Sequence, residues 1–476
     1  MPLVNSFGSR FRVGRVAVIL AVLGVAAPAR ARTYTLPELI ELARKNNPAL
    51  AVAAQQTAAI EAQLVEARRS WHPTGELVSL IAPSPEIRCQ IDPGLMLARP
   101  PGQTDKQYRQ DHCFETNVSE ARLNLKGVFT RTELRMVQPV FTFGKISAGV
   151  NAAEAGIASS RNREAAVAAE LDLNVRKAYW GVKTAREILE TLAEGIGHVE
   201  EGQKTIDKAL ADQSGTVTIG DKLRMKTLRV EVEARRLEFT KLEDIARSGL
   251  RFLIGAEARH DLEVDAEPIE PIAAPARPVS QSLDQARLSR PEARALDFLV
   301  ASRQALADFE RRKQYPDLVL MGTATFAFAS SIDDPKNAFA NDPFNSRSVG
   351  LAAALRMPLD LGVKNARALR VHAEAQEAYH RRREALGGIT FEIEKAHAGL
   401  TEAQARVKVM KDGEKAGKQW INLVAQNFAA GLAETKDFAD ALLAYFQFRI
   451  RYLEAVYDAN LAVATLSRAV GAEIAP

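Results

Sequence analysis

The sequence contains the same plan twice, because landmark residues recur in the same order in both halves at nearly constant separations. The pairs are Pro48 with Pro291 and Pro73 with Pro316, each 243 residues apart; Pro139 with Pro358, 219 apart; and Gly215 with Gly431 and Gly255 with Gly471, 216 apart. Self-similarity at a fixed offset indicates a duplicated structural unit. The change of offset places about 24 extra residues of the first half between Pro73 and Pro139.

We therefore predict two structural repeats, 32–267 and 281–476, joined by a proline-rich linker at 268–280. Each repeat is expected to contain a helical segment, then a β-hairpin, then a long helical hairpin. The helical segments are about 36–70 and 281–314, and the β-hairpins are 74–135 and 317–357.

Residues 1–31 have the character of a secretory signal peptide. A basic region with three arginines precedes a short apolar run, 16–27, and two small-residue cleavage patterns follow near residue 30. An N-terminal membrane anchor is the alternative, although the run is too short to span a bilayer. The chain has 63 Lys and Arg against 59 Asp and Glu, and four arginines lie in 1–31. The remaining chain is balanced in charge, which gives no basis for a nucleic-acid partner.

Long helices are predicted because proline is missing from 140–267 and from 359–475. Residues 145–213 alone would form a rod of about 100 Å. Apolar residues there follow the alternating three- and four-residue spacing of a coiled-coil seam. These are Val175, Ala178, Val182, Ala185, Leu189, Leu192, Ile196 and Val199. A solitary amphipathic core helix is the alternative, but so long a rod is buried more easily by neighbouring helices.

The predicted strands alternate in residue character, as in Leu320, Gly322, Ala324 and Phe326 of the second hairpin. No stretch after the signal peptide approaches 18 consecutive apolar residues, so a membrane location would require β-strands. Half-buried strands of a soluble protein show the same alternation. Four strands cannot close a water-filled barrel, because small barrels need about eight. A membrane barrel would therefore require self-association.

In its landmarks the chain resembles the TolC-like outer-membrane efflux proteins. The resemblance rests on the opening segment 34–48, the second start at 290–292, the strand-to-helix passages at 138–141 and 357–359, and the closing pattern of 431–471. It implies a mainly α fold with a β-barrel portion. A long α-helical barrel would be joined to four β-strands per protomer, contributing to a 12-stranded barrel in a homotrimer. It also implies an outer-membrane location in a Gram-negative bacterium, a periplasmic adaptor protein and an inner-membrane transporter.

The two helix–helix turns resemble the periplasmic tips at which the adaptor docks in this family. The candidate docking residues are Gly215, Thr218, Asp221, Gly431, Leu432, Thr435 and Asp437. Helix capping by Asp221 and Asp437 is the structural alternative to adaptor contact. Which of the two tips dominates in docking stays open.

Three further sets of residues are candidates. Asp412 and Glu414 could line a periplasmic constriction, or could lie on a solvated helix face. Arg122, Asn124 and Lys126 are expected to face the barrel lumen, unless the strand register is shifted by one residue. Cys89 and Cys113 are expected to form a disulfide in an external loop, because an exported chain with two cysteines commonly pairs them.

No enzyme motif appears in the sequence: HExxH, P-loop, GxSxG and GxGxxG patterns are all missing. We therefore expect no catalytic, cofactor or metal site. The expected function is a passive exit duct for efflux or for type I secretion, two alternatives that the sequence does not separate. A soluble periplasmic coiled-coil scaffold is the alternative from another class.

Overall fold

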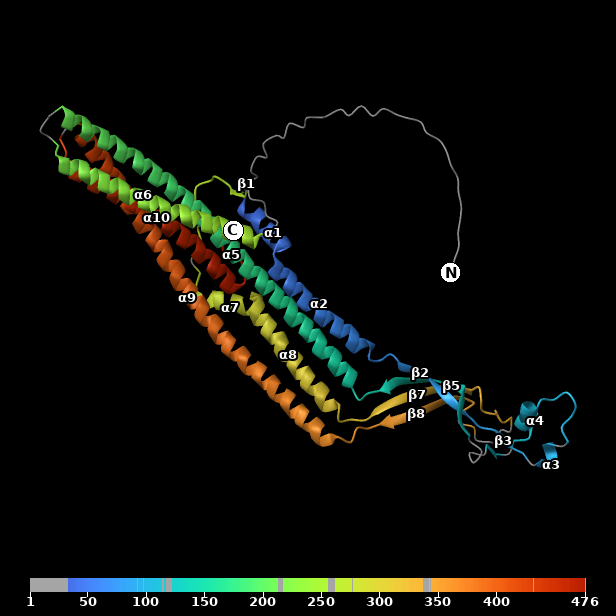
Figure 1. Cartoon of the computed structure of the whole chain (residues 1–476). Coiled ribbons are helices and arrows are strands. Elements are labelled where there is room, and N and C mark those ends of the chain that lie inside the picture. The colour runs from blue at the N-terminus through green and yellow to red at the C-terminus, as the bar shows by residue number, and fades with distance from the viewer. Residues whose placement is uncertain are drawn as a thin grey trace, which may run out of the picture.

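The computed structural model describes residues 33–475 apart from 92, 97, 114, 117–121, 213–216, 256–261, 276, 337–341, 343 and 431. The predicted signal peptide lies outside these residues. The described chain is elongated, with long helices over most of its length and a β-sheet with two loops at one end (Figure 1). None of the described helices combines the length and the apolar character needed to cross a bilayer.

The two halves contain the same series of elements. The first half has α1 (Leu36–Asn46), α2 (Pro48–Arg69), β2 (Thr74–Glu86), β5 (Arg122–Phe141), α5 (Lys145–Ala211) and α6 (Ile219–Leu253). The second half has α7 (Val279–Ser289), α8 (Pro291–Arg312), β7 (Asp317–Ala329), β8 (Ser346–Arg356), α9 (Leu361–Ala429) and α10 (Thr435–Val470). The lengths also agree, since α1 and α7 have 11 residues each and α2 and α8 have 22 each. The structure thus confirms the internal duplication.

The remaining elements are short. They are β1 (Thr33–Tyr34), β3 (Cys89–Gln90), α3 (Pro93–Met96), α4 (Asp105–Asp111), β4 (Glu115–Thr116) and β6 (Glu263–Val264). β1 pairs in parallel with β6, and β3 pairs with β4. The first of these pairs ties the start of the described chain to the segment that precedes the linker.

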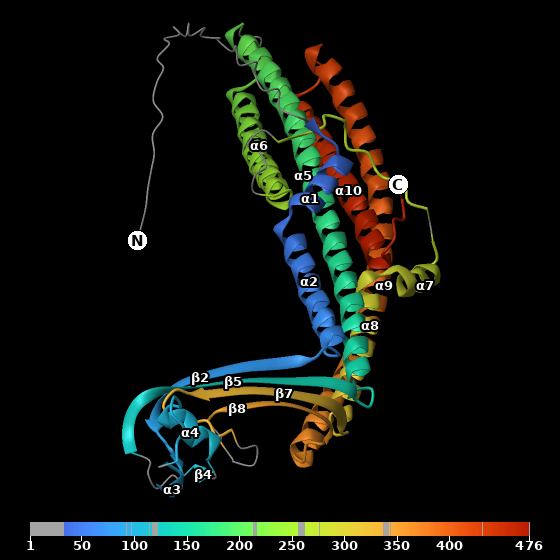
Figure 2. The same cartoon turned by 90° about the vertical axis from the view of Figure 1, so that its right-hand side faces the viewer.

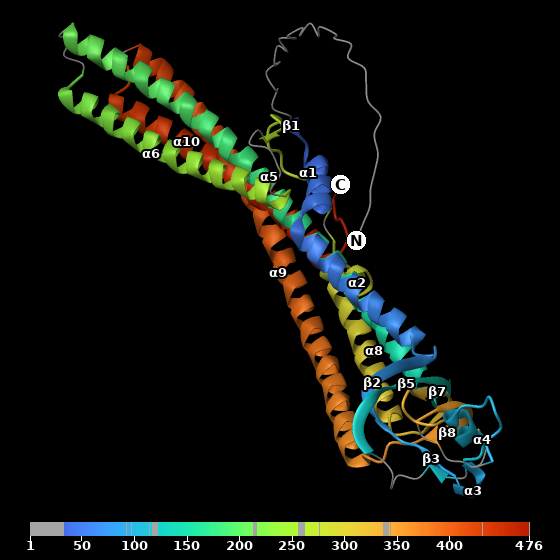
Figure 3. The same cartoon turned by 45° about the vertical axis from the view of Figure 1, so that its right-hand side comes forward.

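The helical part is built on α5 and α9, which have 67 and 69 residues. Figure 3 shows that both run nearly the whole length of this part, while α6 and α10 lie along one half and α2 and α8 along the other. In the half without the sheet the helices lie in the order α6, α5, α10, α9 (Figure 2). Because these four helices form a single layer, each helix can bury only the stripe of its surface that faces its neighbours.

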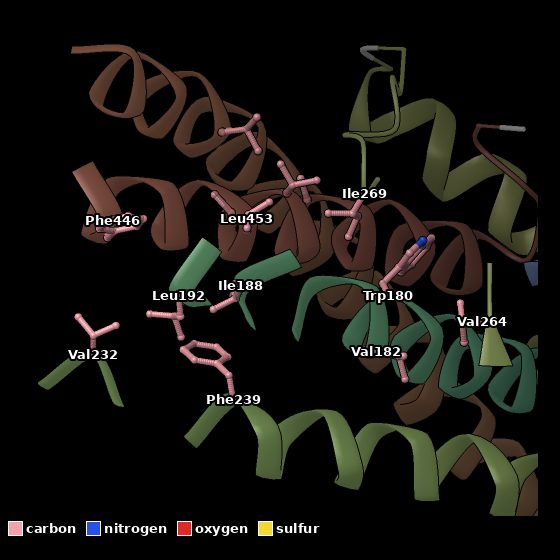
Figure 4. Packing of buried hydrophobic residues seen from close by; sticks show 14 of the residues in the cluster. Trp180, Val182, Ile188, Leu192, Val232, Phe239, Val264, Ile269, Phe446 and Leu453 are labelled. Carbon is pink, nitrogen blue, oxygen red and sulfur yellow. The ribbon is translucent and has the colours of Figure 1, made fainter. Parts of the chain in front are cut away.

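The predicted seam of α5 lies in the main hydrophobic cluster. Val175, Val182, Ala185, Leu192 and Val199 are buried, and Ala178, Leu189 and Ile196 are partly buried against the same cluster. Figure 4 shows Ile188 and Leu192 of α5 between Phe239 of α6 and Leu453 of α10. The seam therefore packs against both neighbouring helices, as a coiled-coil pattern predicts.

A four-stranded antiparallel sheet forms the other end of the molecule, in the order β2-β5-β7-β8. The two hairpins are joined by pairing between β5 and β7, from Phe129 opposite Ala329 to Phe141 opposite Leu318. β5 continues to Phe141, six residues beyond the predicted end of the first hairpin. Pro139 is tolerated there because the register shifts between Pro139 and Phe141, and a proline fits at such an irregularity.

Each repeat ends in the same joint. Asn47 Nδ2 donates to the Leu253 carbonyl at 2.8 Å, and Arg290 Nη1 donates to the Ala469 carbonyl at 3.0 Å. Gly255 and Gly471 follow these carbonyls at φ values of 101° and 75°, a backbone region that favours glycine. The recurring proline and glycine landmarks are thus the residues that join the end of α6 to the α1–α2 break and the end of α10 to the α7–α8 break.

Candidate docking tips and channel face

The first tip is defined by the start of α6. Thr218 is its N-cap: Thr218 Oγ1 accepts a hydrogen bond from the Asp221 N–H at 3.3 Å, and the Asp221 carboxylate accepts from the Thr218 N–H at 2.9 Å. The hydroxyl of Thr218, followed by its backbone N–H, lowers the pKa of Asp221. Asp221 therefore has the capping role that was its structural alternative, while Gly215 lies outside the described residues.

The second tip has a different local structure. α10 starts at Thr435, which is buried, and the rings of Phe428 and Phe438 stack below the turn with centroids 5.0 Å apart. Leu432 is 80% exposed, and Asp437 is exposed in the first turn of α10, where the helix dipole favours an anion. Gly431 lies outside the described residues. The Thr435 side chain also contributes to lowering the pKa of Asp221. Val217 of the first tip and Ala433 of the second pack against the same hydrophobic cluster.

The two carboxylates of the predicted constriction have different surroundings. Glu414 pairs with Arg449 Nη1 of α10 at 2.7 Å, and its side chain is only 17% exposed. Asp412 is exposed. The two residues are two positions apart on a helix and therefore point about 200° away from each other. Their role in a constriction stays a prediction, with the exposed Asp412 as the better candidate.

The sheet has two chemically different faces. One, which we call the charged face, carries Glu76, Arg131, Glu133 and Arg135, with Arg135 Nε 2.5 Å from Glu133 Oε1, and also the exposed side chains of Val78 and Leu80. The opposite, apolar face carries large exposed hydrophobic side chains from all four strands. These are Leu77, Ile81, Leu134, Met136, Leu320, Phe326, Phe328, Val349, Leu351 and Leu355. An apolar outer face and a polar inner face are what a membrane barrel requires.

The lumen-facing role of Arg122, Asn124 and Lys126 stays a prediction. All three residues lie in β5, but the side chains of Arg122 and Asn124 are outside the described set. Lys126 is exposed and lies where the pairing of β5 with β2 is irregular, between Gly127 opposite Ser84 and Arg122 opposite Glu86. The alternation of residues 128–137 therefore does not fix the face of Lys126.

The structure joins Cys89 and Cys113 in a disulfide, with Cα atoms 5.4 Å apart. Both cysteines are buried, although they lie in a loop beyond the end of the sheet. The loop residue Arg109 forms an ion pair with Asp333 of the second hairpin at 2.8 Å. No local pattern predicts this pair, because its members are 224 residues apart.

Sequence reasoning also missed a buried charged group in the helical part. Lys183 of α5, 7% exposed, donates to Asp265 Oδ1 at 2.7 Å, and Tyr179 donates to the other carboxylate oxygen. Burial alone would raise the pKa of Asp265, but the ammonium of Lys183 and the hydroxyl of Tyr179 lower it overall. The group fixes the segment before the linker to α5. Among the described residues, no three His, Cys, Asp or Glu side chains converge on a metal site.

Residues 282–472 match the family described as "Outer membrane efflux protein". The chain is 24% identical over 448 residues to the cobalt-zinc-cadmium resistance protein CzcC of Cupriavidus metallidurans. The alignment covers 92% of this chain and 90% of the relative.

Solved structures give the same fold. The Campylobacter jejuni CmeC outer membrane channel superimposes with a TM-score of 0.73 at 16% identity, covering 92% of this chain and 86% of that one. The outer-membrane channel OprN superimposes with a TM-score of 0.71 at 17% identity, covering 93% and 91%. Residues 282–472 therefore match the outer membrane efflux protein family, and the described chain as a whole has the fold of outer-membrane channels such as CmeC and OprN.

Proposed function

We propose that the chain is the outer-membrane exit duct of a tripartite efflux system, a passive conduit from the periplasm to the exterior that an inner-membrane transporter drives. One observation carries the proposal: a sheet with one apolar and one charged face continues directly into helices about 100 Å long. The sheet has the chemistry of a bilayer-spanning wall. The helices have the length of a periplasmic tube.

The duct requires more than one copy of the chain. β2 and β8 each have a neighbour on one side only within the described chain, so two rows of backbone donors and acceptors are left open. Exposed strand edges cannot face lipid unpaired. Pairing β8 of one copy with β2 of the next satisfies both edges. The resemblance to TolC-like channels implies three copies, which supply twelve strands.

The helical tips are the proposed docking surface for a periplasmic adaptor. Leu432 is the best contact candidate, because its side chain is 80% exposed at the turn between α9 and α10 and is therefore available to a partner. Thr218 and Asp221 hold the neighbouring turn in shape and act on docking indirectly. Asp412 is the residue proposed for the constriction above the tips.

The cargo we propose is a small ion or molecule, with divalent cobalt, zinc or cadmium as first candidates. The support is the name of the relative CzcC, which aligns over nearly the whole of both chains. Type I protein secretion is less well supported. The soluble scaffold is disfavoured, since its sheet would expose the large apolar side chains to water.

Membrane extraction tests the duct. The chain with its leader, expressed in a Gram-negative host, should require detergent for release, should migrate on gels as a heat-dissociable trimer, and should appear in electron micrographs as a threefold hollow tube. Release of a monomer without detergent would contradict the proposal. Loss of cobalt, zinc and cadmium tolerance on deletion of the gene, restored by complementation, would support the cargo.

A further inference from the structure

The loops at the far end of the two hairpins form one unit, which we call the mouth cap and define as the described residues of 87–113 and 330–336. Asp333 is 4% exposed, and its Oδ2 accepts hydrogen bonds from Arg109 Nε at 2.8 Å and from the Cys89 N–H at 3.2 Å. Ile87 N–H donates to the Ser331 carbonyl, and Asp333 N–H donates to the Ile87 carbonyl. A buried charge needs partners in good geometry, so these loops are docked specifically.

Two further links hold the first loop against the second. The Lys336 N–H donates to the Gln110 carbonyl at 3.0 Å, and Lys336 Nζ lies 2.6 Å from Asp111 Oδ1. The disulfide between Cys89 and Cys113 closes the first loop on itself. The cap is therefore fixed by one covalent bond and by two ion pairs that connect different hairpins.

The cap covers one face of the sheet and leaves the other open. Ala327 and Ala329 lie on the charged face at its far end and are 4% and 2% exposed, whereas Phe326 and Phe328 on the apolar face are 46% and 50% exposed. Ile87 and Ile332 form a small core with Ala329, against which Phe129 packs. Gly127 has the phase of Phe129, and a Cβ there would lie 1.4 Å from Ser331 Oγ. The second loop therefore sits directly on the charged face.

The position of the cap matters once the barrel closes. With the apolar face in lipid, the charged face lines the lumen, and the cap lies inside the exit at the end of the strands farthest from the helices (Figure 1). Each copy of the chain adds one cap to the same opening. This step rests on the proposed duct, because only a closed barrel makes the charged face a lumen.

We propose that the mouth cap is a size filter at the exit, and that Asp333, Arg109 and the Cys89–Cys113 disulfide set the size limit by holding the cap on the charged face. Hydrated ions and small molecules pass between the caps. A bulky solute such as a polypeptide is excluded while the Arg109–Asp333 ion pair and the disulfide are in place. The filter thus favours small cargo over protein secretion for this duct.

Labelling from outside intact cells tests the filter without any transporter. The two native cysteines form the disulfide, so a single substitution, Thr323→Cys, introduces the one free thiol. Thr323 pairs with Arg135 on the charged face, exposed and below the cap. Cells are treated with a short impermeant maleimide or with a maleimide on a long polyethylene glycol chain. The short reagent should label Thr323→Cys, and the long reagent should not label it.

The Arg109–Asp333 ion pair and the Cys89–Cys113 disulfide, which we call the latch, are tested by adding Asp333→Ala, or Cys89→Ser with Cys113→Ser, to the labelled variant. Either change should restore labelling by the long reagent. The matched control is Arg99→Ala, which removes an exposed ion pair with Asp105 inside the same loop and should leave the long reagent excluded. The heat-dissociable trimer band reports whether each variant has folded. Two latch variants of different chemistry are used so that a folding failure of one does not decide the result.

Each other outcome has a definite meaning. Equal labelling by both reagents without any latch change would overturn the filter and leave the duct intact. Exclusion of the long reagent in both folded latch variants would overturn the latch. No labelling by the short reagent would place Thr323 away from any lumen, which would overturn the proposed barrel face and the filter together.

Discussion

At the residue scale, the molecule depends on a few polar side chains that finish backbone hydrogen bonds. Asn47 and Arg290 occupy equivalent positions before Pro48 and Pro291, and each donates to a carbonyl at the end of the returning helix of its own repeat. Such carbonyls have no partner within their helix. Two unlike side chains do the same work, which is why the duplication is hard to see at these positions from residue identity alone.

Asn47 makes a separable pair of hydrogen bonds, and this gives a first prediction. Its Oδ1 accepts from the Ala49 N–H at 2.8 Å as the N-cap of α2, and its Nδ2 donates to Leu253. Asn47→Ala should lose about 2 kcal/mol of stability, while Asn47→Ser keeps a cap acceptor and should lose about 1 kcal/mol. Thermal unfolding of both variants in detergent, followed by circular dichroism, measures the difference. Equal losses would contradict the separate role of the bond to Leu253.

The capping box at the first tip predicts a pH dependence. The pKa of Asp221 is lowered in the folded chain by the hydroxyl and N–H of Thr218, so its contribution to stability is present above the unfolded pKa of about 3.9 and is lost as pH falls through the folded value. The first turn of α6 should lose hydrogen-exchange protection, corrected for intrinsic rates, in acid below about pH 4. Asp221→Asn should show reduced protection at neutral pH and no such acid step. If Asp221→Asn loses as much hydrogen-exchange protection in acid as the unmodified chain, the loss must be assigned to another titrating group.

At the element scale, glycines decide how closely the long helices approach. A Cβ at Gly417 of α9 would lie 3.1 Å from Tyr445 Cα of α10, whereas a Cβ at Gly399 of the same helix would meet nothing within 4 Å. Backbone atoms cannot move aside as a flexible side chain can. The spacing of α9 and α10 below the tip is therefore fixed by a residue without a side chain.

This contrast gives a matched pair of substitutions. Gly417→Leu should destabilise the protein by about 1–3 kcal/mol through overpacking against α10. Gly399→Leu should be neutral or should gain up to about 0.7 kcal/mol, because leucine favours a helix more than glycine does. Thermal unfolding in detergent measures both. A similar loss for the two variants would mean that helix packing in α9 is not controlled at Gly417.

The elements that the sequence predicts well are those with a local and repeated signal. The 67 residues of α5 follow from the lack of proline and from the seam between Val175 and Val199, and the second hairpin follows from alternation between two turns. The lumen face at the start of β5 stays a prediction, because the pairing with β2 is irregular between Ser84 and Glu86 and alternation does not continue through it. The Arg109–Asp333 pair and the Lys183–Asp265 pair join residues 224 and 82 positions apart, so they depend on the fold as a whole.

At the scale of the whole molecule, the described chain leaves open surfaces that the proposed trimer would cover. Besides the open edges of β2 and β8, α6 carries an exposed apolar stripe opposite to the side that packs on α5. It consists of Ile219, Leu223, Val230, Leu237, Ile245 and Phe252, with exposed fractions of 57–77%. Leu223, Val230 and Leu237 are seven residues apart, the repeat of a coiled-coil seam. A second helix is expected to cover this stripe.

We expect that helix to come from a neighbouring copy of the chain, since α6 lies at one side of the helical layer and α9 at the other (Figure 2). Leu237→Lys combined with Val230→Lys should then weaken the trimer, because two charges would be buried without partners at the seam. The change leaves the buried side of α6, with Leu228, Val232 and Phe239, untouched. The protomer should therefore keep its helix content while the heat-dissociable trimer band is lost at a lower temperature.

Glu231→Lys is the control, because Glu231 is an exposed residue on the flank of the same helix, about 100° from Val230. It introduces one new lysine without entering the stripe, and its trimer should dissociate at the unmodified temperature. If instead the double stripe variant keeps its trimer, the stripe is not needed between copies. It would then have to be covered by a different helical partner, and the strand edges β2 and β8 would hold the copies together by themselves.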